Sequence, residues 1–137
     1  IGLCASERLD RDSFTGVVAE IDELTPTCQA ERDLLGWEHA EMGAEVLRQW
    51  GMPEEVQMTA RLHHRHEQAV ASPYAETIAC VTIADYLCSR SGWFSMGCHN
   101  VAAPPEPIFR CLEIDADLLT VLWQQLYPAL DSVSELR

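Results

Sequence analysis

The strongest constraint on the fold is the spacing of apolar residues within residues 38–50, EHAEMGAEVLRQW. Apolar and small side chains recur there every three or four residues, which is the repeat of one helix face. This face contains His39, Met42, Gly43, Val46, Leu47 and Trp50. The other side contains Glu38, Glu41, Glu45, Arg48 and Gln49. The pattern predicts a helix with one buried side and one side facing solvent.

Other segments carry helix signals of the same kind. Gly51 ends the first helix, because glycine tolerates the left-handed conformation found after many helices, and Pro53 begins the next helix at its first turn. The further expected helices cover residues 12–24, 27–35, 53–64, 74–91 and 115–126. No segment alternates with a period of two for long enough to form a sheet. We therefore expect an all-α, compact bundle of about five to six helices.

Length and charge narrow the class of protein. A chain of 137 residues supplies one core, so we treat residues 1–137 as a single domain. The net charge is −13, with no lysine and nine scattered arginines, which excludes nucleic acid and anionic membrane surfaces as expected partners. No apolar run approaches the length of a membrane span, and no signal peptide is visible. We expect a cytoplasmic protein.

The six cysteines do not form a recognisable disulfide or zinc pattern. Their spacing is irregular and no CxxC pair occurs, so we expect buried, reduced thiols, as in a reducing cytoplasm. A zinc site at Cys98 and His99 is the alternative, but it lacks the paired spacing of such sites.

Asp85 is the most informative single residue of the chain. It is the only charged residue between Glu76 and Arg90, in a segment that is otherwise apolar or small on every side. That segment predicts the central, most buried helix, and a carboxylate there must be paired, hydrogen-bonded or bound to a metal. The structural alternative is a buried strut that bonds to a histidine or a helix N-terminus.

Three histidines accompany this aspartate. His39 lies on the buried stripe of its helix, His63 follows Val56 on a buried face, and His64 lies about 100° further round the helix. Imidazoles and carboxylates that point inward from three helices are ligands of divalent ions such as iron, manganese, zinc or magnesium. The candidate metal ligands are His39, His63, His64 and Asp85. The same groups could instead hydrogen-bond to one another without a metal.

Residues 34–92 contain an ordered set of motifs. The set is a glycine, a histidine in a segment of the form HAxxGAxLLxxW, a tryptophan-to-proline step into a helix that ends in two histidines, and an Ala-Asp pair. These elements are Gly36, His39, Gly43, Trp50, Pro53, His63, His64, Ala84 and Asp85. In this order and spacing they resemble the C-terminal half of an HDOD domain, a signalling relative of the HD metal-dependent phosphohydrolases. The resemblance implies an HD-domain-like helical fold, with the four ligand-type residues as half of an HD-type metal site.

The chain departs from the family pattern at two points. The family's His-Asp dyad is followed by Ile-Gly, and this chain begins with Ile1-Gly2 and contains no His-Asp pair, so it resembles a domain cut just after the dyad. The branch that hydrolyses cyclic dinucleotides has a GYP motif after the paired histidines. Residues 65–69 read RHEQA instead, which disfavours that branch.

The resemblance implies a non-catalytic domain of bacterial signal transduction, with no catalytic residues of its own. It would act through contacts with a protein partner or with an adjacent sensor or output domain. The alternative is a metal-dependent phosphohydrolase, acting on a phosphodiester or nucleotide, whose His-Asp dyad lies outside this chain. A third interpretation is that the polar cluster only holds three helices together.

Overall fold

The structure is a computed structural model that describes residues 1–21, 27–93 and 101–134. Within these ranges the chain forms nine helices and no strand, and the all-α prediction is confirmed. The helices are α1 (Gly2–Leu9), α2 (Arg11–Glu20), α3 (Thr27–Leu35), α4 (His39–Gln49), α5 (Glu54–Leu62), α6 (His66–Val70), α7 (Ala75–Arg90), α8 (Glu106–Arg110) and α9 (Ala116–Ser134). None of these helices is both long and apolar enough to cross a membrane.

The structure contains more helices than the five or six predicted. The boundaries of α3, α4, α5 and α7 lie within about two residues of the predicted ones. The additional helices are α1 and the five-residue helices α6 and α8. A helix of five residues is too short to show an amphipathic repeat, so the sequence pattern does not reveal it. The helix predicted over residues 12–24 ends earlier, at Glu20, and its last three residues lie outside the described part.

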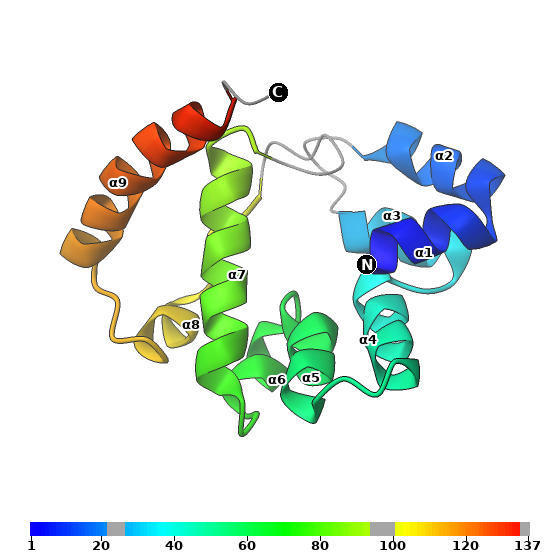
Figure 1. The fold of residues 1–137 in the computed structure, drawn as a ribbon, viewed down its shortest axis with the longest axis horizontal. Coiled ribbons are helices and arrows are strands. Elements are labelled where there is room, and N and C mark those ends of the chain that lie inside the picture. Colours follow the sequence, from blue (N-terminus) through cyan, green and yellow to red (C-terminus); the bar gives the residue numbers. More distant parts are fainter. Residues whose placement is uncertain (22–26, 94–100, 135–137) are drawn as a thin grey trace.

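Two separate apolar clusters organise the molecule. Figure 1 shows α7 in the middle, α9 on one side of it, α1–α4 on the other, and α5 and α6 near its N-terminal end. The larger cluster consists of Leu62, Ala69, Ile78, Ala79, Ile83, Leu87 and Ile108, partly covered by side chains of α9. The smaller cluster consists of Val17, Ala30 and Leu35, together with Phe14, Ile21 and Trp37.

The backbones of α1 and α4 touch at a pair of glycines. A Cβ atom added to Gly2 would lie 1.9 Å from the carbonyl oxygen of His39 and 3.0 Å from the backbone nitrogen of Gly43. No side chain fits at that distance, so α1 can pack here only because residue 2 is glycine. This contact fixes the start of α4, which is the segment that carries His39.

α7 lies in the middle of the fold, as predicted, and has six buried residues, but it is not buried on every side. Ile78, Thr82 and Leu87 are buried, but Val81 is 41% exposed and Asp85 is exposed as well. The segments that pack against α7 are α5, α6 and α8, with side chains of α9 in the same apolar cluster. Its remaining face is not covered by described residues, although its composition is apolar all round.

Candidate metal-binding histidine cluster

Three of the four predicted ligand residues lie together. His39 is the first residue of α4, and His63 and His64 directly follow α5. The ring centroids are 5.5 Å apart for His39 and His63, 5.0 Å for His39 and His64, and 4.0 Å for the two neighbours. The Nε2 atoms of His39 and His64 are 3.1 Å apart. Residues that are 25 positions apart in the sequence therefore present their imidazoles to the same point.

Asp85 does not lie on a buried face, which corrects the sequence prediction. Its side chain is exposed and forms no hydrogen bond or ion pair with any other described residue. Its charge still acts on His63, where it opposes the lowering of the imidazole pKa. Asp85 belongs to the C-terminal half of α7, whereas Figure 1 shows α5 and α6 beside the N-terminal half. The carboxylate stays in solvent, which avoids the cost of desolvating an unpaired charge.

The carboxylate that does join the cluster is Glu31 of α3, which the sequence analysis missed. Glu31 is 0% exposed, and its Oε2 accepts hydrogen bonds from the backbone N–H of His39 at 2.9 Å and from Nδ1 of His39 at 2.6 Å. These bonds place the proton of His39 on Nδ1, so Nε2 points towards His64. Glu31 Oε1 is buried and has no partner among the described residues. The signal for its burial was its helical spacing, three residues after Cys28 and four before Leu35.

The two neighbouring histidines are held in the neutral form near neutral pH. Nδ1 of His63 donates to the carbonyl oxygen of Ala60 at 2.8 Å. Burial is the main cause that lowers the pKa of His63, followed by the charge of His39. Burial of the imidazole also lowers the pKa of His64, with further lowering from His63 and His39. His64 keeps part of its surface in solvent, which weakens the burial effect but not its direction. Neutral imidazole is the form that binds a metal.

Cys28 lies next to these imidazoles, a position that its spacing in the sequence does not predict. Its Sγ and one ring nitrogen each from His39 and His64 all lie within 4.8 Å of one another. Burial raises the pKa of the Cys28 thiol to about 12, and the charges of Glu38 and Glu31 raise it further. Without a metal, the thiol therefore keeps its proton at neutral pH. Thiol and imidazole together form a set of soft and borderline ligands.

The other cysteines take no part in this cluster. Cys4, Cys28, Cys80, Cys88 and Cys111 are free thiols, which confirms the prediction for the described cysteines. Cys4 and Cys80 are exposed and the other three are half-buried, so the prediction of fully buried thiols is wrong for the described cysteines. The alternative zinc site at Cys98 and His99 lies outside the described residues.

Glu38 departs from its predicted place on the solvent side. It is 3% exposed and forms ion pairs with Arg32 and Arg65, and Arg65 also binds Glu41. Burial alone would raise the pKa of Glu38, but the hydrogen bond and charge of Arg32, together with Arg65, lower it overall. Glu38 is the N-cap residue of α4 with φ −108° and ψ 149°. Because this backbone is extended, the helical repeat does not predict the direction of its side chain.

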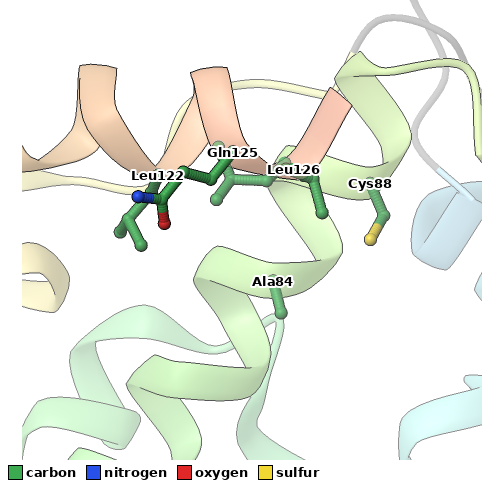
Figure 2. Close-up of a pocket in the computed structure, with 6 residues that line it drawn as sticks. Ala84, Cys88, Leu122, Gln125 and Leu126 are labelled. Atoms are coloured by element: carbon green, nitrogen blue, oxygen red, sulfur yellow. The ribbon is translucent and has the colours of Figure 1, made fainter. Parts of the chain in front are cut away.

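An apolar pocket of about 310 Å³ lies away from the histidine cluster, between α7 and α9. Figure 2 shows Ala84 and Cys88 of α7 opposite Leu122, Gln125 and Leu126 of α9. The pocket contains no residue of the histidine cluster.

Comparison with known families confirms the predicted resemblance. The HDOD domain matches residues 1–66. The matched segment includes Cys28, Glu31, and all three clustered histidines, and it ends before Asp85. No curated protein matches the chain, and no solved structure matches it either.

Proposed function

We propose that the chain, whose residues 1–66 match the HDOD domain, works as a non-catalytic regulatory domain. It acts by contact with a protein partner or with an adjacent sensor or output domain of the same polypeptide. The observation that carries the proposal is that the carboxylate beside the histidine cluster is Glu31 and not Asp85. Glu31 is buried and orients His39, whereas Asp85, which an HD-type site would use as a ligand, is exposed on α7.

This difference matters because a carboxylate that binds a metal and a carboxylate that orients a histidine have different roles. A ligand for a catalytic metal must reach the ion, and hydrolysis of a phosphate ester further needs an open coordination position for water. Glu31 Oε2 instead accepts two hydrogen bonds from His39. The cluster connects α3, α4 and the segment after α5, which suits a structural role.

Exposed apolar side chains support a role in protein contacts. Trp50, directly after α4, is 66% exposed, and Met52 and Val56 are also exposed close to it in sequence. The predicted burial of Trp50 and Val56 is therefore wrong. Val81 is exposed on the uncovered face of α7. Apolar side chains that gather on a surface mark contact sites, because covering them removes hydrocarbon from water. The net charge of −13 favours partners whose contact surface has basic residues at its rim.

The alternative function is a metal-dependent phosphohydrolase, and the proximity of Cys28, His39 and His64 is the observation that favours it. The test is hydrolysis of bis(p-nitrophenyl) phosphate by the protein with Mn²⁺, Fe²⁺ or Zn²⁺. We expect no turnover above that of the His39→Ala variant. Turnover that disappears in His39→Ala and His64→Ala but persists in His66→Ala would establish the enzyme instead.

A second experiment tests the protein contacts directly. A photoreactive amino acid is introduced at Trp50 or Val81 of the protein in its native cells, with exposed Arg110 as the control position. We expect a discrete cross-linked protein from at least one apolar position and none from Arg110. If all three positions give the same result, the exposed apolar side chains are not contact sites.

A further inference from the structure

We propose that Cys28, His39 and His64 form a binding site for a zinc-class divalent ion, in which a thiolate from α3 joins two imidazoles. Neither the helical repeat nor the matched family pattern brings Cys28 to this place; only the fold does. The inference does not depend on the proposed regulatory function, because an ion held here can stabilise the fold without catalysing any reaction.

The distances suit a single ion. Zinc lies about 2.0–2.1 Å from imidazole nitrogens, so two such nitrogens on a tetrahedral ion are roughly 3.3 Å apart. The Nε2 atoms of His39 and His64 are 3.1 Å apart. A thiolate about 2.3 Å from the same ion lies roughly 3.6 Å from each nitrogen. Cys28 Sγ lies within 4.8 Å of one ring nitrogen of each of these histidines, so a movement of about 1 Å brings the thiolate to the distance that a zinc site needs.

Glu31 fixes the tautomer that His39 needs in order to bind an ion through Nε2. A metal-bound histidine usually donates its second ring N–H to a carboxylate, which fixes the tautomer and makes the ligand nitrogen more basic. Nδ1 of His39 contacts Glu31 Oε2 at 2.6 Å, and this leaves Nε2 for the ion. Glu31 Oε1 is buried without a partner, so the buried carboxylate lacks full compensation. A cation bound to His39 would place positive charge near the Glu31 carboxylate and so offset part of the cost of burying it.

The charges also balance. One thiolate and the Glu31 carboxylate together carry two negative charges, which equal the charge of the ion. Glu38, the other buried carboxylate near Cys28, is paired with Arg32 and Arg65. The site therefore takes a doubly charged ion without leaving a net buried charge. Thiolate and imidazole ligands select zinc or cobalt over magnesium and calcium, which prefer oxygen.

Binding requires one proton to leave. The S–H bond of Cys28 breaks, the bond from Sγ to the ion forms, and the proton goes to solvent. His39 keeps its proton on Nδ1, and His64 carries its proton on Nδ1 so that the lone pair of Nε2 reaches the ion. No electron is transferred.

The test is titration of the reduced protein with Co²⁺, which reports thiolate ligation by an intense charge-transfer band in the near ultraviolet. We expect this band to saturate at one equivalent and to disappear when Zn²⁺ is added. Cys28→Ser should abolish the band. The controls Cys80→Ser and His66→Ala, at a described cysteine and a histidine outside the ligand set, should leave it unchanged. A spectrum without the band, or one that survives Cys28→Ser, overturns the proposal.

Two further measurements test the same site without any histidine variant, so they do not depend on how such a variant folds. Zn²⁺ should release about one proton per ion at neutral pH, and Cys28→Ser should remove this release. Zn²⁺ should also slow alkylation of Cys28 at least tenfold while exposed Cys4 reacts at an unchanged rate. Equal protection of both thiols, or no proton release, contradicts the site. None of these outcomes alters the hydrolysis test, so failure of this site and failure of the proposed regulatory function remain distinguishable.

Discussion

The N-terminal region, α1–α4, and the C-terminal region, α5–α9, are stabilised in different ways. The C-terminal region has an apolar cluster of seven buried residues around Ile78. Its buried polar side chains are hydroxyls such as Thr82, whose Oγ1 contacts the carbonyl oxygens of Ile78 and His63, each at 2.9 Å. The N-terminal region has only three buried apolar residues in its cluster, but it buries the two carboxylates Glu31 and Glu38.

This difference shows why the candidate chemistry lies where it does. Burial of hydrocarbon is non-directional, so the apolar cluster holds helices together without fixing the orientation of any one side chain. Hydrogen bonds to a buried carboxylate have defined geometry and fix the groups that donate them. The ligand-type side chains meet where the polar N-terminal region contacts the segment after α5.

Ile78→Ala should give the largest loss of stability. Ile78 is 0% exposed in the apolar cluster, and removing such a side chain costs about 2–5 kcal/mol through lost burial and the cavity left behind. The measurement is the free energy of unfolding from urea denaturation. Val81→Ala, on the exposed side of the same helix, is the control and should cost less than about 0.5 kcal/mol. Equal losses would mean that α7 has no distinct buried side.

Glu31→Gln should reveal the dependence of the N-terminal region on its buried carboxylate. Glutamine keeps the shape but removes the charge, so His39 loses part of its hydrogen bonding, at a cost of about 1–3 kcal/mol. Urea denaturation measures the loss, and nitrogen NMR of the His39 imidazole reports the changed tautomer. Glu7→Gln, at an exposed carboxylate of α1, should change neither quantity. Unchanged signals of His39 would argue against its orientation by Glu31.

Gly2→Ala should disturb the contact between α1 and α4. The new Cβ would meet the carbonyl oxygen of His39, so α1 must move, at a cost of about 1–3 kcal/mol. Gly16→Ala is the matched control, because a Cβ there meets only a side-chain carbon of Leu34, at 3.7 Å. That substitution should stabilise α2 by about 0.4–1 kcal/mol. Opposite signs for the two variants in thermal unfolding would support the close contact, and equal signs would contradict it.

Acidification should destabilise the protein through the histidine cluster. The folded state lowers the pKa of His63 and His64 from the ordinary value of 6.5, so the unfolded chain binds more protons as the pH falls. The free energy of unfolding should therefore decrease as the pH falls through 6.5, when measured with EDTA to remove metals. The decrease should be smaller in His64→Asn. Stability that stays constant or rises across this range would mean that the imidazoles are not held neutral.

Asp85→Ala should have the smallest effect. Asp85 is exposed and has no hydrogen bond or ion pair with another described residue, so its removal should change stability by less than about 0.5 kcal/mol. The Co²⁺ spectrum should also remain unchanged, in contrast to Cys28→Ser. A loss of several kcal/mol would restore the buried network that the sequence alone suggested for this aspartate.

Long and regular segments of this chain show their helices in the sequence, whereas short segments do not. The apolar stripe of residues 38–50 predicted α4 because eleven residues display three full turns of the repeat. Gly51 has a positive φ of 68°, as expected for a glycine that ends a helix. Helices of five residues, such as α6 and α8, were missed because they do not complete the repeat. Glu38 was misplaced because an N-cap residue lies outside the helical geometry.

The sequence by itself determined the all-α class, the main helices, the HDOD resemblance and the candidate role of His39, His63 and His64. Each of these depends on local spacing along the chain, which the printed residues contain in full. Only the tertiary structure decided that Glu31 and Cys28 lie beside these histidines and that Asp85 is exposed on α7. These facts depend on how α3 and α7 pack against other helices. Side-chain neighbours from distant segments are set by that packing and leave no repeat in the sequence.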